Sequence, residues 1–163
     1  MLRHTTPEDA KAIAELYNYY IRHTTFTFEE SLVDTQLMSQ RIASIKAVNL
    51  PWLVYVQDGE LKGYAYASKW KERSAYRFAV ETSVYVAHQH QGQGIGRQLY
   101  SALLETLTAQ GVHTAIGGIT LPNPPSIALH QTLGMHKVAH FEKVGYKFEQ
   151  WLDVGYWQIH LQA

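Results

Sequence analysis

Cysteine is absent from the 163-residue sequence. Its absence excludes disulfide cross-links, cysteine-based zinc sites and a covalent acyl-cysteine intermediate. Charge of either sign is not in excess either, because 14 Lys and Arg side chains balance 14 Asp and Glu side chains. A neutral chain lacks the broad basic surface that non-specific nucleic-acid binding requires, so we expect no nucleic-acid partner. Any anion site must therefore be local.

Long apolar runs are missing as well. No stretch approaches the roughly 18 apolar residues that cross a bilayer. The first residues, Met1–Asp9, contain neither the apolar core of a signal peptide nor a small-residue cleavage site. We therefore expect a soluble cytoplasmic protein that does not contact a membrane. With 46% hydrophobic residues and no repeat or linker, the chain predicts a single domain over 1–163.

The hydrophobic pattern predicts a mixture of helices and strands. Thr6–Asp9 is typical of a helix start, and a second helix is expected near Asp34. Asp58-Gly59, between strand-like runs at 52–56 and 61–67, predicts a β-hairpin. The remaining elements are expected as a strand over 76–86, a helix ending near 110, a strand over 112–119, a short helix over 126–133, and two strands near 136–141 and 152–161. The order β-α-α-β-β-β-α-β-α-β-β predicts a mixed α/β domain rather than a strict βαβ repeat.

The sharpest local feature is a glycine-rich loop between a strand and an amphipathic helix. Gly92, Gly94 and Gly96 alternate within the segment Gln91–Arg97. Alternate glycines let the backbone approach a ligand closely, and a helix N-terminus offers free N–H groups to an anion. A pyrophosphate is the ligand that suits such a loop best, and Arg97 could form a charge-assisted hydrogen bond to it. A glycine-rich turn that serves only backbone geometry remains an alternative.

Two common phosphate-binding motifs do not fit this loop. A dinucleotide fingerprint needs glycine at position 97, where Arg97 stands. The Lys-Ser/Thr ending of a Walker loop is also missing. The loop is therefore neither a dinucleotide fingerprint nor a Walker loop.

The spacing Gln91-x-x-Gly94-x-Gly96 after a strand resembles the acetyl-CoA motif of the GCN5-related N-acetyltransferases (GNAT). The resemblance implies the GNAT acyl-CoA N-acyltransferase fold, in which helices flank a central, mostly antiparallel mixed sheet. It also implies acetyl-CoA as co-substrate, attacked directly by an amine in a ternary complex. The coenzyme contacts that it implies are Val84, Tyr85, Val86, Gln91, Gly92, Gln93, Gly94, Ile95, Gly96, Arg97, Asn123 and Ser126.

Blocks along nearly the whole chain resemble one subfamily, the phosphinothricin and methionine sulfoximine acetyltransferases. They run from about Leu2 to Leu161 and include Thr27–Glu29, Pro51–Val54, Gly63–Ala67, Val80–Val86, Ser126–His130, Val144–Phe148 and Trp151–Val154. The resemblance implies acetylation of the α-amino group of L-phosphinothricin, methionine sulfoximine or methionine sulfone. Detoxification and herbicide resistance would follow, and the enzyme would be a homodimer.

Two side chains are candidates for catalysis. Glu81 lies inside an otherwise β-branched and aromatic strand, where a carboxylate is costly unless it is paired or solvated by a site. Partial burial would raise its pKa toward that of a general base. A Glu81 paired with Arg77 is the alternative. His130 is the second candidate, because an imidazole exchanges protons near neutral pH. By resemblance it protonates the departing thiolate, while a backbone N–H on Val84–Val86 stabilises the oxyanion. A helix histidine that only packs is the alternative.

An amino-acid substrate needs a cation for its carboxylate and a carboxylate for its ammonium group. Candidate contacts are Phe28, Glu29, Arg73 and Arg77, although each charged side chain could instead form a surface ion pair.

Other functions stay open at this point. The nine histidines invite a metal interpretation, but no fixed carboxylate accompanies them, and we predict no metal. An acetyltransferase for another small amine or for a protein N-terminus is an alternative. A non-catalytic acetyl-CoA sensor is another.

Overall fold

The structure is a computed structural model that describes residues 1–162. Its strands are β1 (Leu2–His4), β2 (Trp52–Gln57), β3 (Glu60–Lys69), β4 (Ala79–Val86), β5 (Thr114–Leu121), β6 (His136–Lys147) and β7 (Gln150–His160). Its helices are α1 (Ala10–His23), α2 (Thr35–Ala47), α3 (Ile95–Ala109) and α4 (Pro124–Thr132), with short 3-10 turns at Pro7–Asp9, Ser74–Tyr76 and His88–His90. The order of helices and strands is the predicted one.

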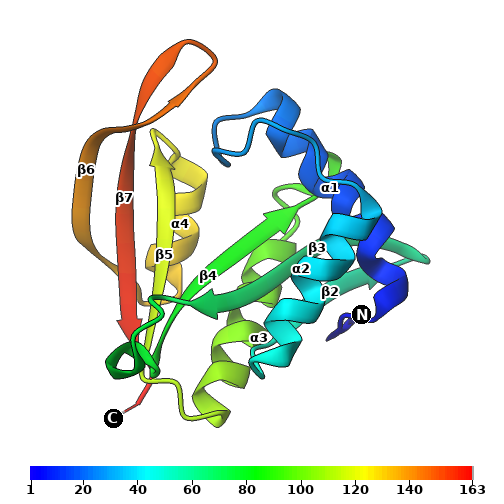
Figure 1. Ribbon diagram of the computed structural model, residues 1–163, viewed down its shortest axis with the longest axis horizontal. Helices are drawn as coiled ribbons and strands as arrows, with labels where there is room; N and C mark the ends of the chain where they lie inside the picture. The colour runs from blue at the N-terminus through cyan, green and yellow to red at the C-terminus, as the bar shows by residue number, and fades with distance from the viewer. Residues whose placement is uncertain (163) are drawn as a thin grey trace.

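One sheet of seven strands carries the fold, in the order β1-β2-β3-β4-β5-β7-β6. Only β4 and β5 are parallel neighbours; the other neighbours are antiparallel. α1 and α2 lie over one face, and α3 lies behind the other (Figure 1). The predicted mixed α/β fold, with a mostly antiparallel sheet flanked by helices, is confirmed.

The two faces of the sheet have separate cores. α3 buries Leu99, Leu103 and Leu107 against one face, as its apolar spacing predicts. α1 and α2 bury a second cluster, which includes Ile13 and Met38, against the other. Because side chains alternate along a strand, β4 contributes to both cores.

β4 and β5 stay together for only three residue pairs, which end at Glu81↔Ile116. Beyond that point, β4 remains paired with β3 as far as Val86, and β5 remains paired with β7 as far as Leu121. The two strands therefore diverge, as Figure 1 shows, and a wedge opens in the middle of the sheet. One edge of β4, from Thr82 to Val86, faces this wedge without a partner strand among the described residues.

Two predicted boundaries were wrong by three residues or more. The strand expected from Tyr76 begins at Ala79, because Ser74–Tyr76 forms a turn in which the Tyr76 N–H donates to the Arg73 carbonyl at 3.0 Å. The strand expected to end near 141 continues to Lys147 through a bulge. Within residues 1–162, no helix is both long and apolar enough to cross a membrane.

Candidate functional site

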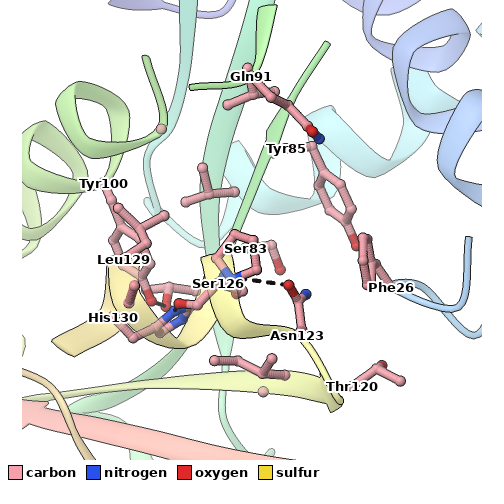
Figure 2. A pocket seen from close by; sticks show the side chains of 18 of the residues that line it. Phe26, Ser83, Tyr85, Gln91, Tyr100, Thr120, Asn123, Ser126, Leu129 and His130 are labelled. Atoms are coloured by element: carbon pink, nitrogen blue, oxygen red, sulfur yellow. Dashed lines mark hydrogen bonds between the residues drawn. The ribbon is translucent and has the colours of Figure 1, made fainter. Parts of the chain in front are cut away.

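A cavity of 860 Å³ occupies the wedge between β4 and β5. Figure 2 shows Phe26 and Tyr85 on one side of it and Tyr100 and His130 on the other. The residues predicted to contact a coenzyme that do line it are Val84, Tyr85, Val86, Gln91, Gly92, Gly94, Ile95, Gly96, Arg97, Asn123 and Ser126. Gln93 belongs to the predicted set but is not among the lining residues.

The glycine loop forms an open cradle at the start of α3. Gly92 and Gly94 have φ angles of +77° and +80°, a left-handed conformation that side chains other than glycine rarely adopt. A Cβ added at either position would meet no heavy atom within 4 Å, so the space beside this backbone is open. The Gln98 N–H donates to the Gly94 carbonyl at 3.1 Å, which leaves the amides of the first helical turn without helical partners. The cradle fits an anionic group such as a diphosphate.

Gln91 fixes this loop to the rest of the protein. Its Nε2 donates to the Tyr20 hydroxyl at 2.8 Å, and that hydroxyl donates to the Val86 carbonyl. The loop is thereby tied both to α1 and to the end of β4. The sequence pattern had not singled out Tyr20.

Glu81 is a half-buried carboxylate at the point where β4 and β5 separate. Burial raises its pKa, and the positive charge of Lys71 offsets only part of that effect. Among the described residues, its carboxylate has no hydrogen-bond or ion-pair partner. The alternative pairing with Arg77 is not seen, because that guanidinium donates to the Ser74 carbonyl at 3.0 Å. An unpaired carboxylate with a raised pKa beside a cavity is suited to accept a proton.

His130 on α4 is buried, with 6% of its surface exposed. Its Nδ1 lies 2.7 Å from the Ser126 carbonyl, which can only accept, so Nδ1 carries the hydrogen. Burial lowers the pKa of the ring, although the bond to Ser126 opposes this shift. Near neutral pH the imidazole is therefore uncharged, with a lone pair at Nε2.

Glu81 and His130 lie on opposite faces of the sheet, as the surroundings of two adjacent glycines of β5 show. A Cβ at Gly117 would lie 2.5 Å from the His130 Nε2, whereas a Cβ at Gly118 would lie 3.6 Å from a Glu81 carboxylate oxygen. Adjacent residues of a strand face opposite sides. The two candidate catalytic groups therefore lie next to the wedge on opposite faces of the sheet.

Tyr100 is a cavity residue that sequence reasoning missed. Its hydroxyl lies 2.5 Å from the Thr82 Oγ1, and its ring meets the His130 ring edge-on, with centroids 5.0 Å apart. Burial raises its pKa, which keeps the phenol protonated. The available signal was its place in the apolar stripe of α3, next to Leu99.

The four candidate substrate contacts have different surroundings. Phe28 lines the cavity. Glu29 is not among the lining residues, and the Arg41 guanidinium binds both of its carboxylate oxygens at 2.6 and 2.8 Å. Arg73 and Arg77 are exposed and are not among the lining residues.

In the described part of the chain, no group of three or more His, Asp or Glu side chains is placed to hold a metal ion. The histidines that the sequence offered are therefore not gathered into a metal-binding arrangement.

Comparison with known proteins gives a consistent result. Residues 2–155 match the family described as the acetyltransferase (GNAT) domain. Phosphinothricin N-acetyltransferase of Streptomyces viridochromogenes is 38% identical over 96% of this chain and 85% of its own. The L-methionine sulfoximine/L-methionine sulfone acetyltransferase of Salmonella typhimurium is 36% identical over 98% of this chain and 94% of its own.

A solved structure agrees with these sequence relatives. The structure of a Salmonella typhimurium protein with its cofactor acetyl-CoA superposes with a TM-score of 0.97 at 35% identity. The match covers 99% of this chain and 94% of that one.

Proposed function

The chain belongs to the GNAT acetyltransferase family, and we propose that it transfers the acetyl group of acetyl-CoA to the α-amino group of a glutamate-like amino acid. The proposed substrates are L-phosphinothricin, methionine sulfoximine and methionine sulfone, after the names of its relatives. The observation that carries the proposal is the unpaired, half-buried Glu81 at the apex of a wedge whose far end is the open glycine cradle.

The coenzyme side of the cavity suits acetyl-CoA along its length. The free amides at the start of α3 and the side chain of Arg97 provide donors for the diphosphate. The unpaired edge of β4 offers backbone groups to the extended pantetheine arm, as a strand would use them. Asn123 and Ser126 line the cavity nearby and complete the proposed contacts.

In the proposed reaction, the amine nitrogen attacks the thioester carbonyl carbon. Glu81 first accepts a proton from the ammonium, which gives the nitrogen its lone pair. The carbon–nitrogen bond then forms and the carbon–sulfur bond breaks. The nitrogen releases a second proton as the amide forms, which balances the proton that the departing thiolate takes up. A backbone N–H of Val84–Val86 stabilises the oxygen as its charge develops. The departing thiolate leaves on the side of Tyr100 and His130. Because His130 is uncharged near neutral pH, it must first bind a proton at Nε2 to act as the acid.

Acetylation removes the positive charge of the amine, so the product no longer resembles a charged α-amino acid. This change supports a role in detoxification and in resistance to herbicidal glutamate analogues. The co-substrate is an intracellular metabolite, which supports a cytoplasmic location. We treat residues 1–163 as one catalytic domain.

We also propose a homodimer. The number of exposed apolar side chains on β6, β7 and their connection supports it: Val138, Phe141, Val144, Tyr146, Phe148 and Trp151. β6 is also an edge strand of the sheet, with an open row of backbone groups. Sedimentation equilibrium is expected to give twice the mass of the chain. A monomer at micromolar concentration would contradict the proposal.

A thiol-release assay tests the substrate. Acetyl-CoA is mixed with phosphinothricin, methionine sulfoximine, methionine sulfone, other free amino acids and short peptides. We expect turnover on at least one glutamate-like analogue and none on peptides. Acetyl-CoA binding without thiol release on any amine would instead indicate a sensor, and activity on peptides alone would indicate a protein acetyltransferase.

A further inference from the structure

The wall of the cavity on the Glu81 side includes a segment with no helix or strand of its own. Phe26, Thr27 and Phe28 all line the cavity and belong to the connection between α1 and α2. No ladder of backbone hydrogen bonds holds such a segment, so side-chain contacts must fix it. One of them is local, since the Tyr17 hydroxyl of α1 lies 2.7 Å from the Thr27 Oγ1.

A second contact comes from the far end of the chain. Lys147, the last residue of β6, is 1% exposed, and its Nζ donates to the Thr27 carbonyl at 2.8 Å. Burying an ammonium is unfavourable unless it is hydrogen-bonded, and burial indeed lowers the pKa of Lys147. The negative charges of Glu29 and Glu30 offset part of this cost. The Thr27 carbonyl is therefore the hydrogen-bond acceptor of a buried ammonium.

A third contact joins the same two segments. The Phe28 ring lies directly against the backbone of Gly145, where any Cβ would overlap it. Glycine at this position in β6 leaves room for the ring. Gly145 and Lys147 alternate with exposed neighbours, so both face the same side of the strand. Together they hold Thr27 and Phe28.

A bulge in β6 sets the direction in which Gly145 and Lys147 face. In the register with β7, Phe141 faces Val154 and Gly145 faces Leu152, so three residues of β6 form a bulge opposite Asp153. The Lys143 N–H donates to the Asp153 carboxylate at 2.9 Å and closes the bulge. Bulges bend a strand and re-aim the side chains beyond them. Here the bend comes directly before Gly145 and Lys147.

We propose that Gly145 and Lys147 form a clamp that positions the acceptor wall of the cavity, with Lys147 as the positioning residue. The clamp gives the connection after α1 one fixed conformation, in which Phe26 and Phe28 shape the space beside Glu81. This inference rests on the proposed function, because it takes that space to be the amine site. It assigns no role to the clamp in acetyl-CoA binding, since neither residue lines the cavity.

Lys147→Met tests the clamp, because methionine is similar in length but has no donor. We expect the KM for the amine to rise by about tenfold or more, while the KM for acetyl-CoA stays within about twofold. Amide hydrogen exchange over residues 24–30 should accelerate by about tenfold or more, since the segment loses an anchor. Lys147→Arg keeps a donor and is expected to recover part of the amine affinity.

Lys137→Met is the matched control, since Lys137 is an exposed lysine of the same strand, β6. It should leave both KM values and the exchange pattern unchanged. Gly145→Ala is a second, independent test, because its methyl group displaces Phe28, and we expect the same selective rise in the amine KM. It also serves if Lys147→Met does not fold.

Wild-type values for the amine KM in folded Lys147→Met and Gly145→Ala would overturn the clamp. Faster exchange without a change in the amine KM would also overturn it, because the wall would then not position the substrate. If the wild-type enzyme acetylates no amine, the proposed function fails on its own. The exchange measurement still decides whether Lys147 fixes the segment.

Discussion

The two sides of the cavity are built in different ways. The coenzyme side comes mostly from one continuous stretch, the end of β4, the glycine loop and the start of α3, between Val84 and Arg97. The Glu81 side is assembled from segments far apart in the chain, including Phe26–Phe28, Gly118–Thr120, Val154 and Tyr156. A phosphate cradle needs backbone amides in a fixed order, which one loop can supply. A selective amine site needs side chains from several directions, which only the folded sheet brings together.

The largest expected effect concerns the base on the Glu81 side. Glu81→Gln keeps the shape of the side chain but removes its ability to accept a proton. We expect kcat to fall by about 100-fold or more, the usual contribution of a general base. The dissociation constant for acetyl-CoA, measured by titration calorimetry, should change by less than about twofold. A normal kcat with weakened acetyl-CoA binding would mean that Glu81 acts in coenzyme binding and not as the base.

The pH profile adds a control for the same variant. Glu81 acts as a base only when it is ionised, and burial raises its pKa. The rate of the wild-type enzyme should therefore fall as the pH drops through the raised pKa of Glu81. The residual activity of Glu81→Gln should lack this acidic limb.

A smaller effect is expected on the coenzyme side. Gly94→Val places a branched side chain at a φ of +80° and fills the open space of the cradle. We expect the dissociation constant for acetyl-CoA to rise by about tenfold or more. Calorimetry measures it, and Gly111→Val is the matched control, because Gly111 has a φ of +85° beyond the other end of α3. Equal losses of acetyl-CoA affinity in both variants would mean that strain, not the cradle, is responsible.

The same contrast explains what could be predicted from sequence. The order of elements, the glycine loop and most residues that line the cavity near it were predictable, because periodicity and glycine spacing act over short distances. Glu81 stood out because a carboxylate in an apolar strand is unusual. Tyr100 and the anchoring of Gln91 by Tyr20 were missed, since both depend on partners from other elements.

The surroundings of the charged candidates could not be predicted for a related reason. Glu29 was expected to meet substrate, but Arg41 on α2 neutralises it, and no local pattern reveals that pairing. The role of Gly145 and Lys147 in β6 could not be predicted either. They contact Phe28 and Thr27, respectively, which lie more than a hundred positions earlier in the chain. Long-range packing, rather than local propensity, decides such positions.

The smallest expected effect concerns the turn next to the clamp, and it tests whether the clamp depends on that turn. Phe148 and Glu149 connect β6 to β7 with φ angles of +52° and +60°, which glycine adopts more easily. Glu149→Gly should raise the free energy of unfolding by about 0.5 kcal/mol in urea denaturation, because relief of strain slightly exceeds the added entropy of the unfolded chain.

The control for this change is Glu142→Gly, an exposed glutamate of β6 without a positive φ, which should instead lose about 0.5 kcal/mol. The amine KM of Glu149→Gly should stay within about twofold of wild type, since Lys147 still reaches Thr27. A large rise in that KM would show that the strained turn itself aims the clamp. The amine side of the cavity would then depend on the turn at Phe148 and Glu149 as well as on Gly145 and Lys147.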